Sequence, residues 1–229
     1  MLPARSRAVP GILAVALALA GCADFDNPAA AQGLTRNDLV AGLAAQLSGS
    51  ASLTYAAAYQ LSGGATATIA QAQNPSRTAY RYPGGAVLVT TAATTRCVRK
   101  TCTMTAPPTP TTPLPASLFA DAEKAGLVTP AVVQSLLSAA RLDPDMTVAQ
   151  HDTTIAGRHA TCVALGNVDD AKAREFSTCI TSDGVLGSFT GQVGGKKIDV
   201  AMTGYADRVR SDAFDPSRNA TTVDQRRTL

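Results

Sequence analysis

The segment at residues 55–82, "YAAAYQLSGGATATIAQAQNPSRTAYRY", places apolar residues at every second position. In its first seven residues, Tyr55 to Leu61, the two tyrosines, one alanine and the leucine share one face, which is the pattern of a half-buried strand. The turn dipeptides Gly63-Gly64 and Asn74-Pro75 interrupt this pattern twice. Glycine and proline mark turns between strands. The segment therefore predicts three antiparallel strands joined by short turns.

The pattern extends in both directions from this segment. After it, "AVLVTTA" (86–92) and "TTRCVRKTCTMT" (94–105) read as further strands, so the first half of the chain predicts a meander of about six strands. Before it, "TRNDLVAGLAAQLSGS" (35–50) places leucines at every fourth position, Leu39, Leu43 and Leu47. That spacing predicts a helix with one apolar face, with Thr35 as its N-cap.

A proline-rich stretch, "APPTPTTPLP" (106–115), separates this meander from a different region. Proline density of this kind predicts an extended linker. Two short helices are expected next, within residues 116–141, the second with Pro130 at its first position. A second run of strands then begins at "TVAQHDTTIAGRHATCVAL" (147–165) and ends at "KKIDVAMTGYADRV" (196–209).

The N-terminus is typical of an exported protein. Arg5 and Arg7 precede an apolar run at 12–20, and "LAGC" (19–22) resembles the bacterial lipobox. The resemblance implies that residues 1–21 are a lipoprotein signal peptide and that Cys22 carries a diacylglycerol. An ordinary secretory signal with an incidental cysteine is the alternative. Residues 22–33 read as a flexible tether, which would hold the domain to the outer face of the cell membrane.

Four cysteines remain besides Cys22: Cys97, Cys102, Cys162 and Cys179. In an exported domain they predict two disulfides, with three pairings possible. The sequence-local pairs, Cys97–Cys102 and Cys162–Cys179, are favoured because a turn at Arg99-Lys100 would place the first two cysteines opposite one another. A four-residue loop would keep that pairing. A zinc site is the disfavoured alternative, since paired C-x₂-C spacings are missing.

Composition limits the function classes. The chain has no tryptophan, five tyrosines and five phenylalanines, so the core has to be built largely from small residues. The formal charge of +3 falls close to neutrality once Arg5 and Arg7 leave with the signal peptide, and no nucleic-acid partner is expected. The polar segment at 216–229 predicts a disordered tail.

The order of these elements resembles the bacterial lipoprotein-carrier and actinobacterial lipoprotein superfamily. The resemblance covers about residues 34–215 and rests on the first hairpins, the helical insert, and the steps "TIAGRHATCVAL", "FSTCITSDGVLGSFTG" and "KKIDVAMTGYAD". It implies an α+β fold in which an unclosed antiparallel β half-barrel, a meander, is wrapped around a few short helices.

The resemblance also implies a hydrophobic ligand, such as a lipid or an acyl chain, held between the sheet and the helices. The residues expected to line that cavity are Leu53, Tyr55, Tyr59, Ile69, Leu88, Leu118, Phe119, Val132, Leu136 and Phe189. The alternative is that these periodic apolar residues are simply the core. The protein would then be a cell-envelope interaction or sensor lipoprotein with a filled core and no ligand cavity.

No catalytic motif is present: the sequence contains no G-x-S-x-G, P-loop, H-E-x-x-H or G-x-G-x-x-G. The two histidines, His151 and His159, lie among polar neighbours on expected strands. We therefore expect a monomeric, non-enzymatic protein with no metal and no cofactor, whose partners are the membrane and either an apolar ligand or an envelope protein.

The lipobox interpretation predicts that Cys22→Ser releases the protein from membranes into the soluble fraction. Two or more acyl chains are needed for firm anchoring, because each buried CH₂ contributes only roughly 0.8 kcal/mol. Membrane fractionation at low protein concentration is the measurement. A Cys22→Ser protein that still pellets with membranes would contradict the lipobox.

Overall fold

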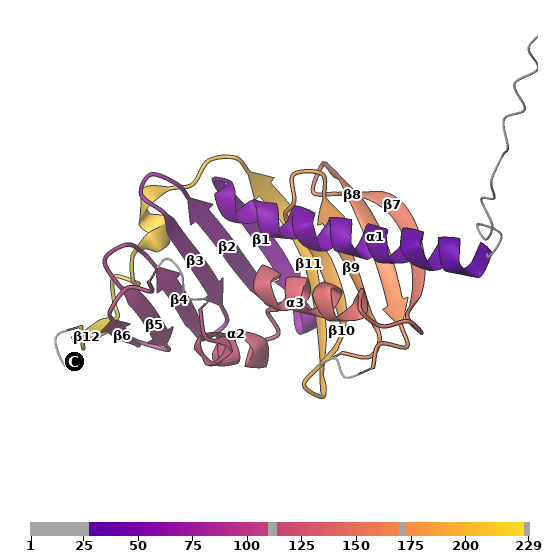
Figure 1. Ribbon diagram of the computed structural model, residues 1–229. Coiled ribbons are helices and arrows are strands. Elements are labelled where there is room, and N and C mark those ends of the chain that lie inside the picture. The colour runs from indigo at the N-terminus through magenta and orange to yellow at the C-terminus, as the bar shows by residue number, and fades with distance from the viewer. Residues whose placement is uncertain (1–27, 110–113, 170–172, 227–229) are drawn as a thin grey trace, which may run out of the picture.

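A computed structural model describes residues 28–109, 114–169 and 173–226; the predicted signal peptide, Cys22 and the first residues of the predicted tether lie outside this range. Within the described residues, twelve strands form a single sheet, and three α-helices lie against one of its faces (Figure 1). We call this the helix face and the other side the opposite face. The sheet does not close on itself, so the fold is an α+β open half-barrel.

The first half of the chain forms the predicted meander, in which each strand pairs antiparallel with the next. Its strands are β1 (Tyr55–Leu61), β2 (Thr66–Ala72), β3 (Arg77–Tyr82), β4 (Gly85–Val89), β5 (Thr94–Val98) and β6 (Thr101–Thr105). The predicted turns are confirmed: Gly63 and Gly64 both have positive φ, which glycine adopts at no steric cost.

The second half adds a meander of its own. Its strands are β7 (Thr147–Ile155), β8 (Arg158–Gly166), β9 (Phe176–Thr181), β10 (Leu186–Val193) and β11 (Lys196–Ala206). The two meanders join where β1 pairs antiparallel with β11, which gives the strand order β12-β6-β5-β4-β3-β2-β1-β11-β10-β9-β8-β7. The sequence pattern did not predict this pairing.

Three α-helices cover the helix face: α1 (Pro28–Gly49), α2 (Ala120–Lys124) and α3 (Pro130–Ala140). Leu43 and Leu47 of α1 are buried as predicted, and α1 packs against α3. Helix α1 begins at Pro28 rather than at Thr35, so the prediction of a flexible tether is wrong from residue 28 to residue 33. The alanine run after Pro28 favours helix, and proline is well accepted in a first helical turn.

Short 3₁₀ turns connect these elements at η1 (Ser50–Ser52), η2 (Ser62–Gly64), η3 (Ala116–Phe119) and η4 (Ser211–Phe214). The last of them belongs to a C-terminal strap, residues 207–220, which crosses the opposite face. Phe214 is buried there in a second, smaller core with Ala79 and Leu88. The guanidinium of Arg77 lies 4.4 Å from the centre of the Phe214 ring, a cation–π contact.

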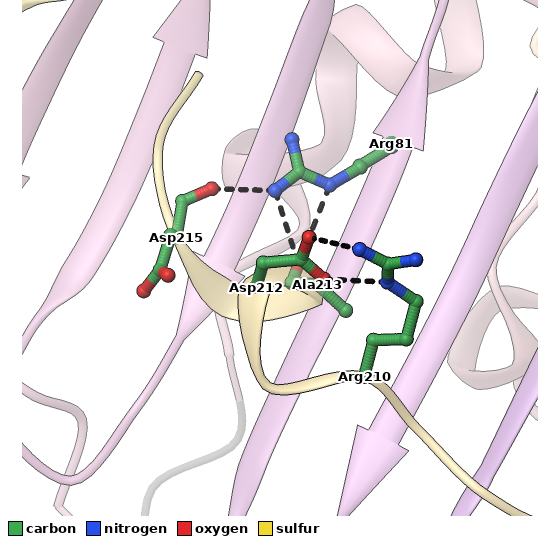
Figure 2. Close-up of polar contacts among 5 residues, drawn as sticks. All are labelled: Arg81, Arg210, Asp212, Ala213 and Asp215. Atoms are coloured by element: carbon green, nitrogen blue, oxygen red, sulfur yellow. Dashed lines mark hydrogen bonds and ion pairs between the residues drawn. The ribbon is translucent and has the colours of Figure 1, made fainter. Parts of the chain in front are cut away.

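Arg81 of β3 also binds this strap, through its backbone carbonyls (Figure 2). Its guanidinium donates hydrogen bonds to the carbonyls of Ala213 and Asp215, at 3.1 Å for Nη2 to the Ala213 oxygen. Beyond the strap, β12 (Thr221–Asp224) pairs parallel with β6. The prediction of a disordered tail is therefore wrong for residues 216–226, because β12 pairs with β6 and Arg77, Arg81 and Phe214 anchor the strap just before it.

Both predicted disulfides are present, Cys97–Cys102 and Cys162–Cys179. Each joins directly opposed residues of neighbouring strands. The expected turn at Arg99-Lys100 is also confirmed, with Arg99 at a φ of 55°. The pairings follow from the meander, because consecutive strands bring sequence-local cysteines face to face.

Loss of the two disulfides should have unequal effects. The Cys97–Cys102 bond spans 5 residues and the Cys162–Cys179 bond spans 17. In the chain-entropy relation these correspond to about 2 and about 3 kcal/mol of unfolding free energy. We expect the Cys162→Ser/Cys179→Ser variant to be less stable than the Cys97→Ser/Cys102→Ser variant by about 1 kcal/mol in urea unfolding. The reverse order would show that loop length does not govern the contribution.

Candidate functional site

The helix face is where a ligand was predicted, and its candidate residues are closely packed there. Six of the ten belong to the main hydrophobic core: Tyr55, Tyr59, Ile69, Phe119, Leu136 and Phe189. Three others are half-buried against that core: Leu53, Leu118 and Val132. These nine side chains therefore lie on the predicted side of the sheet.

The tenth candidate, Leu88, was placed on the wrong face. In the register of β3 with β4, Val87 lies opposite Tyr80 and Leu88 lies opposite Ala79. Val87 belongs to the main core, whereas Leu88 packs with Phe214 under the C-terminal strap. A run such as "AVLV" is apolar at every position, so alternation cannot show which of its residues faces the helices.

The tyrosines of the helix face pack against other aromatic rings and hydrogen-bond to a neighbouring strand. They do not line a ligand cavity of the predicted kind. The Tyr59 hydroxyl donates a hydrogen bond of 2.9 Å to the carbonyl of Leu186, across the junction of the two meanders. The Tyr55 and Tyr205 rings stack at a centroid distance of 6.1 Å. The Tyr80 and Phe119 rings form a T-shaped pair with a centroid distance of 5.0 Å.

Burial also sets the charge state of this cluster. Desolvation raises the pKa of Tyr80 to about 12 and raises the pKa of Tyr59 well above its ordinary value. The pKa of Tyr55 is raised for the same main reason. These phenols therefore stay neutral at physiological pH and act as hydrogen-bonding core residues.

A small hollow lies beside the tyrosines, between the end of α1, the start of α3 and strands β1–β3. Its volume is about 150 Å³, and it is lined by Leu47, Ser48, Ser50, Ala51, Tyr55, Gln71, Tyr80, Pro130, Ala131 and Gln134. The Gln71 amide nitrogen already donates to the carbonyls of Ser50, at 2.7 Å, and Leu53, at 3.2 Å. This hollow is about half the size of the smallest usual ligand pockets, roughly 300 Å³.

The larger hollows lie away from all but one of the ten residues predicted to line a ligand cavity. One of about 530 Å³ is open to solvent across β7–β10, and one of about 570 Å³ lies beside Arg174 and Lys197. A more apolar groove of about 260 Å³ lies where β5 begins and β6 ends, beside Pro108 and Leu118. Leu118 is the one predicted cavity residue that lines any of these three hollows.

The remaining site predictions concern metals and the membrane. Within the described residues, no three His, Cys, Asp or Glu side chains come together in a way that could hold a metal ion. His151 and His159 are both exposed. The described helices include none that is both long and apolar enough to cross a membrane. Cys22, the predicted lipidation site, lies outside the described residues.

Sequence reasoning missed one feature of the surface, the edge strand β7. It pairs with β8 on one side and is the last strand of the sheet on the other. Seven of its nine residues are exposed, and they point alternately to both faces of the sheet. A signal was present: "TVAQHDTTI" carries polar residues at both odd and even positions, which is typical of a strand covered on neither face.

No model of a known protein family matches this chain, and no curated protein sequence matches it. Among solved structures, it is similar to MucB, with 12% identity and a TM-score of 0.48 over 80% of this chain and 64% of MucB. MucB in complex with MucA(peri) gives 13% identity and 0.47, over 80% of this chain and 62% of that one. The chain thus spans less than two thirds of MucB.

A third similar structure is an uncharacterized conserved protein from Thermus thermophilus. The identity is 10% and the TM-score 0.44, over 82% of this chain and 99% of that one. Likeness at this level assigns no activity, ligand or partner to the chain.

Packing around Ala57 allows a direct test of whether this face is filled. Ala57 lies between Tyr55 and Tyr59 on β1, is 1% exposed, and is flanked by Ile69 and Tyr205 on the neighbouring strands. Ala57→Trp should cost roughly 1–3 kcal/mol of unfolding free energy, because a packed core cannot absorb the added volume. Gln60→Trp, on the exposed side of the same strand, is the matched control and should cost little. Equal stability of the two variants would indicate spare space beside Ala57.

Proposed function

We propose that this protein is an exported lipoprotein of the cell envelope that acts by binding another protein. Two disulfides support export, since such bonds persist in oxidising compartments and are rare in the cytosol. The lipobox-like "LAGC" supports attachment of the chain to the outer face of the cell membrane through Cys22. Neither sequence motifs nor the described side chains suggest an enzyme.

The packed helix face is the observation that favours a protein partner over a hydrophobic ligand. Tyr59 and Phe189, which a ligand would have to contact, are both 0% exposed and are in the same core as α1 and α3. Phe189 stacks on Phe176 at a centroid distance of 5.8 Å. A hydrophobic ligand could enter between sheet and helices only if this packing separated, and each large apolar side chain exposed in that way costs roughly 1.5–3 kcal/mol.

A carrier of lipids or acyl chains is therefore the second candidate. It draws support from the resemblance in element order and from the position of nine predicted wall residues on the helix face. The small hollow beside Tyr55, at about 150 Å³, offers it little room. A protein-binding function needs no cavity, and the exposed surface outside the packed face is available for it.

Two measurements on the exported chain test this proposal. In native mass spectrometry, we expect the purified protein to carry no lipid other than the anchor on Cys22. In intact cells, a photo-crosslinking amino acid placed at exposed positions, one at a time, should form a discrete adduct with another protein. Suitable positions are Gln150 on β7, Gln192 at the end of β10, and Thr222 on β12.

The expected result is an adduct at one or more of these positions and not at a buried control position such as Val200. A stoichiometric lipid in the folded domain, without any protein adduct, would instead establish the carrier function.

A further inference from the structure

The two edges of the sheet differ in whether another strand of the chain pairs with them. At one end, the edge of β6 is covered by the chain's own strand β12. At the other end, β7 has nine residues and no strand beside it among the described residues. An unpaired edge presents a row of free N–H and C=O groups, which is a template for another strand.

The hydrogen-bond pattern identifies the backbone groups that face outward. The Ser182 N–H donates to the His159 carbonyl at 2.8 Å, so His159 and every second residue after it on β8 face β9. The residues between them, including Cys162, face β7. Cys162 lies opposite His151, so the backbone of His151 points inward to β8. The outward groups therefore belong to Val148, Gln150, Asp152 and Thr154.

Strand β7 lacks the features that protect most natural edges. Its sequence "TVAQHDTTI" contains no proline, lysine or arginine. Its register with β8 runs without interruption from Thr147 to Ile155, so no bulge twists the edge away. Both of its faces are open over Ala149–Thr154, all of which are exposed. Natural proteins usually blunt long edges by such devices, which favours a functional reason for leaving this one open.

Helix α1 contacts the chain at the start of this edge strand. Arg36 donates a hydrogen bond of 3.2 Å to the carbonyl of Met146, directly before β7. Eight helical residues precede Arg36, and Figure 1 shows the N-terminal end of α1 extending beyond β7. At 1.5 Å per residue they extend roughly 12 Å, the width of about two further strands spaced some 4.8 Å apart. Their sequence, "PAAAQGLT", carries no charge.

We infer, resting on the proposed protein-binding function, that the β7 edge is the docking site for an extended segment of a partner protein, which adds a strand antiparallel to β7. Main-chain hydrogen bonds to Val148, Gln150, Asp152 and Thr154 supply the affinity, and side chains on alternate positions supply the specificity. The added strand lies below the overhanging turns of α1.

The side chains of β7 specify what that segment carries. Val148 is half-buried against the main core, so the partner residue opposite it is apolar. Asp152 is exposed and is the one acidic residue of β7, so the partner residue opposite it is a lysine or arginine. Asp152 already accepts a hydrogen bond from Thr161, at 2.9 Å, and a carboxylate has further acceptor sites. In antiparallel order, the partner motif is a basic residue followed four positions later by an apolar one.

A second copy of this chain fits the same edge less well. If two β7 strands paired through all four outward residues, Gln150 of each copy would lie opposite Asp152 of the other. The two Asp152 carboxylates would then be diagonal neighbours on one face, about 7–8 Å apart, and the two negative charges would repel each other. We therefore assign the edge to a different protein.

The test uses the full exported chain and a display library of random twelve-residue peptides. Selected peptides should contain the basic-to-apolar spacing and alternate β-forming residues. In hydrogen exchange, a bound synthetic peptide of the selected sequence should slow the amides of Val148, Gln150, Asp152 and Thr154 at least tenfold. Gln150→Pro removes one outward N–H without breaking the ladder to β8 and should weaken that peptide at least tenfold. Gln150→Ala keeps the N–H and should change binding less than twofold.

Other outcomes overturn the inference. They are peptides that bind Gln150→Pro as tightly as the wild type, protection confined to other strands, failure to enrich any peptide, or a dimer in sedimentation that Gln150→Pro abolishes. Thermal unfolding of both variants close to that of the wild type excludes loss of the fold as a cause. The peptide measurement does not use the natural partner. If it fails, the proposed protein-binding function can still be tested by cellular crosslinking at positions outside β7.

Discussion

The pairing of β1 with β11 is the contact on which the rest of this half-barrel depends. Every other antiparallel pair in the sheet joins strands that are consecutive in the chain, whereas this pair joins the first strand to one more than 130 residues later. The register shifts between Ala58 and Tyr59, and the shift brings Tyr205 beside Tyr55. The Tyr59 hydrogen bond to Leu186 reaches one strand further, to β10. Without these contacts the chain would be two separate meanders, each with an uncovered apolar face.

This junction also explains why the helix face is closed. A chain with few aromatic residues has to concentrate them to build a core, and the described tyrosines and phenylalanines other than Phe214 belong to or pack against the main core on the helix face. Helices α1 and α3 add leucines and valines from above. The large side chains that could have lined a cavity are thus the same ones that the fold requires for its stability. A large apolar side chain cannot both pack in the core and line an empty pocket. In this fold these side chains pack in the core.

Local pattern predicted much of this structure. Period-two alternation and turn dipeptides indicated both meanders, and their consecutive pairing indicated the disulfides. Apart from the start of α1, the predictions that failed were ones that depend on distant partners. The sequence of neither β1 nor β11 indicates that the two strands pair. The run around Leu88 is apolar at every position, so it does not indicate which face of the sheet Leu88 lies on. The tail was misread because its polar composition gives no sign of the contacts that order the chain there. Arg77 packs on Phe214, and Arg81 binds the carbonyls of Ala213 and Asp215, and both contacts require the folded sheet.

The open edge and the first residues of helix α1 lie at the same end of the described structure. Helix α1 runs outward past β7, and Pro28 at its start is six residues from Cys22. An extended chain covers at most about 3.5 Å per residue, so in the proposed lipoprotein the lipid lies within roughly 20 Å of that helix end. In that lipoprotein the β7 edge, which no other described strand pairs with, would be held close to the bilayer, while β12 is at the other end of the sheet. A segment that docks on β7 would therefore come from a membrane-bound or membrane-proximal protein, because tethering both partners to one surface raises their effective concentration. That gain allows a short strand, with few side-chain contacts, to bind well enough to function.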